Sequence, residues 1–323
     1  MKRSFSLHTI QCAAVLTAAA GFAALSPAGA VEVNLYNGEV AADAGITLGS
    51  WGGSKAEETT DEKLNGDRTI KLKARDLYQG ARLDFSKPFN LAAVLKQPNA
   101  YLLVTFKKSA TAQQINVVPG GGMGVPGMEG GMMMGPQGGM EGMPGLGNSG
   151  TAQIPPVSKL RALFIGAGKP VEACSVGDLK TDDGGWTTVG IPLSSLKDKI
   201  TSNTFSVKRL VVSADSADTI YIARVALVND NNSINAQVTA DRYNEIKVNN
   251  TVSFTATAAA GITPLHLSWD FDASNGIQED AIGDHVEYSF LKPGRYTVTL
   301  TARAEDNAQK DPATETVEVE VVP

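Results

Sequence analysis

Hydrophobic and polar residues alternate along much of the chain. The clearest stretches cover residues 70–74, 81–85, 296–300 and 316–321. Alternation with a period of two places one face of a strand on a core and the other in water, as in antiparallel sheets. Continuous apolar runs at 101–104 and 210–212 are suited to inner strands of a sandwich. Helical periodicity is nearly absent, and short helices or turns are expected only at 91–95 and 194–199.

Turn-forming Gly, Pro, Asn and Asp separate these short strands, a pattern typical of β-sandwiches. A polar run at residues 229–233 divides the strand series in two. A chain of 323 residues also fits two domains of roughly 100–200 residues each. We therefore expect an all-β protein with a jelly-roll β-sandwich at 31–230 and an immunoglobulin-like β-sandwich at 231–323.

A segment rich in Gly and Met interrupts the first domain at residues 119–150. Glycine occupies 14 of its 32 positions, and the segment has no aromatic residue. Such a composition buries too little apolar surface to offset the entropy of ordering, which predicts a disordered loop inserted in one sandwich. An alternative is a soft-metal site for Cu(I) or Ag(I), because thioether sulfur suits soft ions. Its ligands would be Met128, Met132, Met133 and Met134.

The first 30 residues have the three-part layout of a signal peptide. Lys2 and Arg3 precede an apolar stretch, and Ala28-Gly29-Ala30 presents small residues at the cleavage positions. We therefore expect a secreted protein, periplasmic or at the cell surface. No later apolar run reaches the roughly 20 residues that a membrane-spanning helix needs. Only Cys174 remains after the leader, so no intramolecular disulfide is expected.

Charge and motif content limit the function classes. The chain has 28 Lys and Arg against 34 Asp and Glu, a formal net charge of −6, which argues against a nucleic-acid partner. No Gly-x-Ser-x-Gly elbow, His-Glu-x-x-His helix or phosphate-binding glycine loop occurs. A glycosidase that uses a carboxylate pair is left open by a chain with this many acidic residues. The two-module layout favours a protein that is not an enzyme.

The second domain carries a double motif. Trp269-Asp270-Phe271 is followed by the set Tyr288, Pro293, Gly294, Tyr296, Val298 and Leu300. This order resembles the PKD domain, an immunoglobulin-like β-sandwich, over about residues 233–323. The chain departs from the family where 272–276 replaces a Gly-Asp-Gly turn. We expect Trp269 in the core of this sandwich.

Acidic residues follow the first motif closely. Asp270 is expected to bridge a turn through its carboxylate. The alternative is a calcium site, because hard cations prefer clustered carboxylates. Its ligands would be Asp270, Asp272, Asp280 and Asp284, with Glu279 nearby. The spacing is not that of an EF-hand, and no other cofactor is expected.

The first domain carries a looser set of motifs. Residues 184–196 contain Gly-Trp-x-x-Val-x-Ile-Pro-Leu, and residues 220–228 contain Tyr-Ile-Ala-Arg-Val-Ala-Leu. Over roughly residues 33–230 this resembles the galactose-binding-like jelly roll of secreted carbohydrate-binding modules. Ala223-Arg224 stands where that family usually has an Asp pair, so the structural calcium site of the family is not expected in this domain.

The resemblance implies a carbohydrate site built from exposed aromatic faces and hydroxyl-binding side chains. The candidates are Trp51, Tyr78, Gln79 and Arg82. The protein would then be a secreted, non-catalytic binder of extracellular or cell-envelope carbohydrate, with the PKD-like domain as a spacer or adhesion module. In the alternative, Tyr78 and Trp186 pack in the core, Trp51 anchors a loop, and the protein is a structural or protein-binding component of a surface layer or extracellular matrix. Exposure of Trp51 would favour the first interpretation, and burial the second.

Overall fold

The computed structural model describes residues 33–76, 78–109, 114–116, 151–153, 157–177, 179, 185–306 and 308–323. The expected signal peptide at 1–30 lies outside these ranges, as do Met128, Met132, Met133 and Met134, so both expectations stay predictions. No helix in the described ranges is long and apolar enough to cross a membrane.

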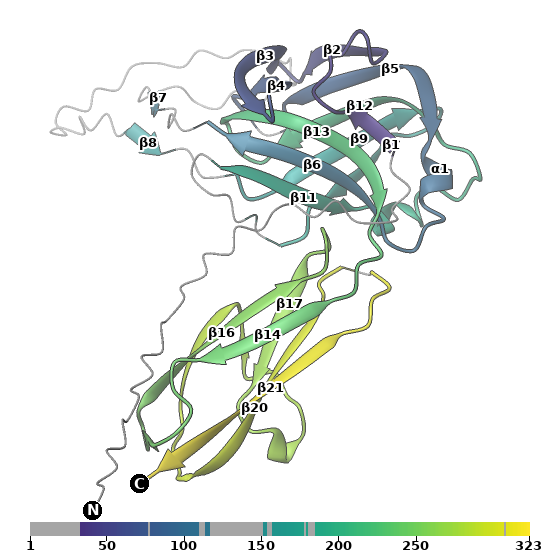
Figure 1. The fold of residues 1–323 in the computed structure, drawn as a ribbon. Helices are drawn as coiled ribbons and strands as arrows, with labels where there is room; N and C mark the ends of the chain where they lie inside the picture. The colour runs from purple at the N-terminus through teal and green to yellow at the C-terminus, as the bar shows by residue number, and fades with distance from the viewer. Residues whose placement is uncertain are drawn as a thin grey trace, which may run out of the picture.

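Two antiparallel sheets form the first domain (Figure 1). Sheet A has the order β11-β6-β13-β4-β3, with β1 also paired to β13; its strands are β1 (Val33–Tyr36), β3 (Lys55–Leu64), β4 (Asp67–Lys73), β6 (Ala100–Lys108), β11 (Trp186–Pro192) and β13 (Thr219–Asn229). Sheet B has the order β10-β9-β12-β5-β2; its strands are β2 (Ile46–Trp51), β5 (Gly80–Asn90), β9 (Leu160–Gly166), β10 (Val171–Cys174) and β12 (Ser206–Ala214). The expected all-β class is confirmed.

Short elements connect these strands. Helix α1 (Leu91–Val94) and the 3-10 turn η1 (Ser194–Leu196) lie where short helices are expected. The side chain of Asn90 caps α1 by accepting a hydrogen bond from the backbone N–H of Ala92. A two-stranded ribbon pairs β7 (Gln114–Asn116) with β8 (Thr151–Gln153).

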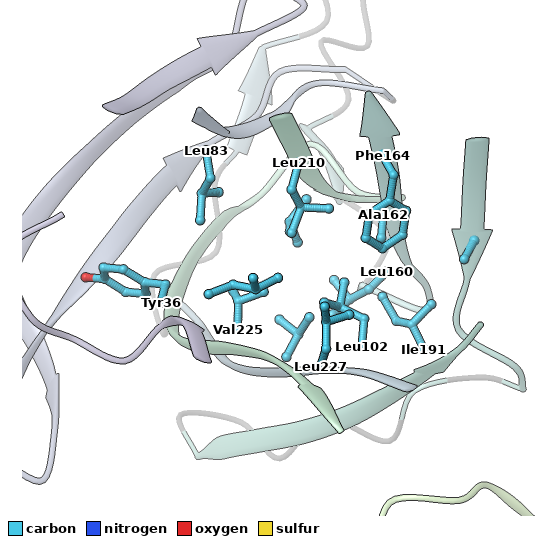
Figure 2. Close-up of a cluster of buried hydrophobic side chains, with 14 of the residues drawn as sticks. Tyr36, Leu83, Leu102, Leu160, Ala162, Phe164, Ile191, Leu210, Val225 and Leu227 are labelled. Carbon is cyan, nitrogen blue, oxygen red and sulfur yellow. The ribbon is translucent and has the colours of Figure 1, made fainter. Parts of the chain in front are cut away.

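The core of the first domain lies between the two sheets (Figure 2). Leu83, Leu210 and Phe164 point inward from sheet B, toward Leu102 and Leu227 of sheet A. Each of these side chains is at most 1% exposed. Because successive residues of a strand point to opposite faces, the neighbours of these residues point away from the core. The inward set therefore determines which residues sheet B presents on its other face.

The second domain is a β-sandwich that continues directly from β13 (Figure 1). One sheet contains β14 (Asn235–Ala240), β16 (Thr251–Ala259) and β19 (His285–Ser289). The other contains β15 (Ile246–Lys247), β17 (Leu265–Asp270), β18 (Ala281–Ile282), β20 (Gly294–Ala304) and β21 (Ala313–Val322); the turn η2 (Ala273–Asn275) follows β17. Trp269 is fully buried beside Phe254, and its indole N–H donates to the carbonyl of Gly283 at 2.8 Å. The expected core role of Trp269 is confirmed.

An apolar patch on the outer side of sheet A meets the second domain. Tyr101 and Leu103 of β6 join Ala226 and Val228 of β13 in a buried cluster, with Ile262 of the second domain packed against it. This contact explains the continuous apolar run at 101–104. Alternate residues of the run face the sandwich core, and the others face the domain junction.

A buried ion pair lies at the centre of the same junction. Asp230 is fully buried and its carboxylate accepts hydrogen bonds from the backbone N–H groups of Ile262 and Thr263. The Lys310 ammonium lies 3.2 Å from Asp230 Oδ2 and also donates to the carbonyls of Asn232 and Ala260. Burial raises the pKa of Asp230, but hydrogen bonds from Asn232 and Thr263 and the charge of Lys310 outweigh it, so the pKa lies below its usual value.

Side chains at the edge of the junction add further links. Tyr101 Oη donates to Asp306 Oδ2 at 2.7 Å. The backbone N–H of Gln309 donates to Asn99 Oδ1 at 2.7 Å, and Asn99 Nδ2 donates to the carbonyl of Gln309 at 3.4 Å. An apolar patch, a buried ion pair and these hydrogen bonds together fix the second domain against sheet A.

Candidate functional site

Sheet B presents polar and aromatic side chains on the side away from the core, which we call the outer face of sheet B. Leu83 and Leu210 point into the core, so their neighbours Arg82, Asp84 and Arg209 point outward. Cross-strand pairing sorts the outer face into three rows: Trp51, Gly80, Ser213, Arg161 and Cys174; Gly49, Arg82, Val211, Leu163 and Glu172; Thr47, Asp84, Arg209 and Ile165.

The position of Trp51 is fixed by a tight turn at the end of β2. Gly52 and Gly53 adopt positive φ angles of 66° and 87°, which glycine reaches without steric cost. Ser54 Oγ accepts a hydrogen bond from the backbone N–H of Trp51 and donates to the carbonyl of Gly80 on β5. The Trp51 side chain is half-buried, and the Arg209 guanidinium carbon lies 6.0 Å from its ring centroid.

Tyr78 and Gln79 lie beside this turn. A β-carbon added to Gly52 would come within 3.2 Å of the Tyr78 carbonyl oxygen, so the two backbones are in contact. The Tyr78 side chain is 61% exposed, and the Arg161 guanidinium carbon lies 4.5 Å from its ring centroid. Gln79 Oε1 accepts a hydrogen bond from the backbone N–H of Arg75 at 2.7 Å. The alternative that places Tyr78 in the core is wrong, because its ring lies at the surface.

Arg82 and Arg209 share one carboxylate. Arg82 Nε lies 3.0 Å from Asp84 Oδ2, and Arg209 Nε contacts Asp84 Oδ1. A β-carbon on Gly49 would lie 2.6 Å from Arg82 Nη2, which shows that the guanidinium group of Arg82 rests against the backbone of β2. Charged groups of both signs therefore lie flat on the sheet, close to the turn that holds Trp51.

The structure brings all four candidate carbohydrate residues together. Trp51, Tyr78, Gln79 and Arg82 come from β2, β5 and the loop before β5, and β2 pairs directly with β5. Three further residues of the site, Asp84, Arg161 and Arg209, are absent from the candidates of the sequence analysis. For Asp84 the alternation at 81–85 was an available signal, but Arg161 and Arg209 come from β9 and β12, which join the site only through pairing.

Trp186 lies elsewhere, half-buried at the start of the edge strand β11 in sheet A. It pairs with Lys107 of β6. The sequence-based alternative placed this ring in the core, but it does not belong to the buried cluster between the two sheets.

The carboxylates proposed for calcium have other contacts. Asp270 is buried, and its two oxygens accept hydrogen bonds from the backbone N–H groups of Asp272 and Gln278. Asp280 Oδ2 likewise accepts from the backbone N–H of Phe271, and Asp272 Oδ1 accepts from that of Ser274. In the described part of the chain, no group of three or more His, Cys, Asp or Glu side chains is placed to hold a metal ion. The expected turn-bridging role of Asp270 is confirmed, and calcium binding stays a prediction.

A cleft of about 530 Å³ lies between the two domains, on the other side of the first sandwich. Its lining includes Thr187 and Thr188 of β11, Ile262, and His266 of β17. His266 Nε2 lies 2.7 Å from Glu279 Oε2. The cleft forms part of the domain junction and contains none of the candidate carbohydrate residues.

Solved structures similar to this chain include the three described in this paragraph. The PKD1 domain of Vibrio anguillarum Epp is 22% identical over 28% of this chain and 96% of that one, with a TM-score of 0.21. The fibronectin(III)-like modules of Clostridium thermocellum CbhA are 16% identical over 51% of this chain and 80% of that one, with a TM-score of 0.23. Three N-terminal domains of the bacteriophage RB49 outer capsid protein Hoc are 12% identical over 52% of this chain and 50% of that one, with a TM-score of 0.22.

A search of curated proteins gave no match. The family model of the PKD domain matches residues 235–321. This range begins with β14 and ends within β21, so it spans the whole second sandwich. It also contains the fully buried Trp269 and the Asp270 turn of the double motif. The second sandwich of this chain is therefore a PKD domain.

Proposed function

We propose that the protein is a secreted, non-catalytic binding protein that engages extracellular or cell-envelope carbohydrate through the outer face of sheet B. The observation that carries this proposal is that Trp51, Tyr78 and Arg82 lie together at the outer face of sheet B, with Gln79 in the adjoining loop. The first sandwich would then act like the galactose-binding-like jelly rolls that its motifs resemble.

The chemistry of this face suits a sugar polymer. The exposed ring of Tyr78 and the half-buried ring of Trp51 offer apolar surface to the C–H groups of a sugar. Arg82 and Asp84 beside them offer hydrogen-bond donors and acceptors for hydroxyl groups. Small ligands usually need a concave pocket, whereas an open sheet face suits an extended chain laid across it.

The carboxylates of this face support a non-catalytic role. Asp84 contacts two arginines, and Glu172 lies 3.6 Å from Arg161. Glycoside hydrolysis requires a carboxylic acid that protonates the leaving oxygen, together with a second carboxylate. The two carboxylates of the three rows each lie beside arginine instead, an arrangement that suits binding of a sugar chain.

The PKD domain would act as a spacer or adhesion module. Its junction with sheet A is apolar, hydrogen-bonded and closed by the Asp230–Lys310 ion pair. The C-terminus lies at the end of the PKD domain remote from the first sandwich (Figure 1). A fixed junction of this kind would hold the outer face of sheet B at a constant distance and orientation from whatever the PKD domain contacts.

Retention of the purified protein on a panel of soluble and insoluble polysaccharides tests the proposal. Trp51→Ala and Tyr78→Ala should abolish retention on the polymer that holds the wild type. Tyr243→Ala is the matched control, because Tyr243 is an aromatic residue of the PKD domain with 43% exposure. No retention on any polymer would contradict the proposal and favour a structural or protein-binding role in a surface layer or matrix, with the cleft between the domains as the first surface to test.

A further inference from the structure

Three arginines lie on the outer face of sheet B, one on each of three neighbouring strands. Arg82 belongs to β5, Arg209 to β12 and Arg161 to β9, and β12 pairs with both of the other strands. Arg209 lies opposite Ile165, four residues along β9 from Arg161. At 3.3–3.4 Å per residue, the backbone positions of Arg161 and Arg209 are about 13 Å apart along the strands, with Arg82 in the row between them. Arginines from three different strands therefore share this face.

Positive charge exceeds negative charge in the three rows of this face. Asp84 and Glu172 are the acidic residues of these rows, against three arginines. One carboxylate, Asp84, serves both Arg82 and Arg209, and each arginine reaches it through Nε. The chain as a whole has a net charge of −6, so this cationic face contrasts with the rest of the molecule.

The terminal nitrogens of two arginines have donor capacity to spare. Among the hydrogen bonds between described residues, none engages an Nη group of Arg82 or Arg209, and both arginines approach Asp84 through Nε. Their side chains are 32% and 34% exposed, so a ligand can reach them. A guanidinium group presents a planar pair of donors that matches the two oxygens of a carboxylate. The face therefore lacks an acceptor, and a ligand carboxylate would supply it.

We propose that the outer face of sheet B binds an acidic polysaccharide, a chain whose uronate carboxylates pair with Arg82, Arg209 and Arg161 while its sugar rings contact Tyr78 and Trp51. This inference rests on the proposed function and specifies its ligand class. Aromatic rings beside spaced guanidinium groups match a polymer that alternates apolar sugar surface with carboxylates. A net acidic protein is a poor electrostatic match for a nucleic acid, which carries a denser array of charges.

The test compares polygalacturonate with the same polymer after its carboxylates have been reduced to alcohols. The purified full-length protein should bind polygalacturonate about tenfold more tightly than the reduced polymer, because charge-assisted hydrogen bonds are lost with the carboxylates. Affinity for polygalacturonate should also fall as sodium chloride is raised. This comparison needs no variant and does not depend on the folding of one.

Arg82→Gln and Arg161→Gln provide the second arm. Each should lose about tenfold in affinity for polygalacturonate and clearly less for the reduced polymer, because a glutamine amide can still donate to hydroxyl groups but cannot form a charge-assisted hydrogen bond. Arg295→Gln is the control, since Arg295 lies on β20 of the PKD domain and its side chain is 81% exposed. Asp84 keeps Arg209 as a partner in Arg82→Gln, so the site retains one ion pair.

The outcomes separate the two proposals. Equal affinity for the two polymers would overturn the acidic ligand and leave carbohydrate binding standing. Equal or tighter binding of dextran sulfate would overturn the assignment to carboxylates and indicate a response to charge alone. Binding to a neutral polysaccharide but not to polygalacturonate would overturn the inference, whereas binding to no polysaccharide at all would remove the proposed function itself.

Discussion

Replacing Lys310 by Met tests the buried ion pair at the domain junction. The substitution keeps an unbranched apolar side chain, so it removes the charge while preserving much of the packing. The Lys310 side chain is 3% exposed and that of Asp230 is fully buried, so the lost ammonium leaves a carboxylate inside the protein without its cation. The carbonyls of Asn232 and Ala260 lose a donor as well.

The expected loss follows from the contacts that remain. Breaking a buried ion pair by removing one partner costs about 3–5 kcal/mol. The Asp230 carboxylate would still accept hydrogen bonds from Asn232, Ile262 and Thr263, which stabilise its charge. We therefore expect the lower end of that range, about 3 kcal/mol in the free energy of unfolding.

Urea unfolding of the purified protein, followed by circular dichroism, measures this difference. Arg295→Met is the control, because Arg295 is 81% exposed and lies 3.8 Å from Glu320. An exposed pair of this kind should contribute less than about 1 kcal/mol. If Lys310→Met unfolds at the same urea concentration as the control, the Asp230–Lys310 pair does not hold the junction and our reasoning is wrong.

Three further predictions concern groups with distinct environments. The pKa of Asp230 is lowered in the folded protein, so the stability that its charge contributes is present above about pH 4, where a free aspartate titrates. This stability is lost as the pH falls through the lowered pKa of the folded protein. The free energies of unfolding of wild type and Lys310→Met should therefore converge at low pH, and a difference that persists there would contradict this. Trp269→Ala should lower the free energy of unfolding by about 3–5 kcal/mol in calorimetry, because it removes a fully buried ring; a loss below about 1 kcal/mol would contradict the packing of the PKD core. Cys174 is exposed, but partial desolvation and the nearby Glu172 raise the pKa of its thiol. Alkylation by iodoacetamide at neutral pH should therefore be slower than that of free cysteine, and an equal or faster rate would count against this environment.

The sequence predicts the fold well because the fold depends on local alternation. The stretches at 81–85 and 316–321 lie within β5 and β21, and the motif around Trp269 lies in the PKD core. Part of the site follows for the same reason. Arg82 and Asp84 lie on the alternating stretch 81–85, so the alternation predicts that they share one face of β5.

Long-range pairing explains what the sequence did not predict. Arg161 and Arg209 reach the outer face of sheet B only because β9 and β12 pair next to β5, and the alternation within one strand contains no information about its neighbours. The junction shows the same limit. The polar run at 229–233 predicts a domain boundary, yet Asp230 within it is fully buried against Lys310, a partner 80 positions away.

The most direct test of carbohydrate binding by the outer face of sheet B uses the three tryptophans of the chain as reporters. Trp51 lies on this face, Trp186 lies on sheet A, and Trp269 is fully buried in the PKD domain. Their indole N–H signals can be followed by NMR in the ¹⁵N-labelled protein during addition of an oligosaccharide from the polymer that retains it, with Trp51→Phe assigning one signal. We expect the Trp51 signal to move while the other two stay in place. Movement of the Trp186 or Trp269 signal with an unchanged Trp51 signal would contradict the central claim.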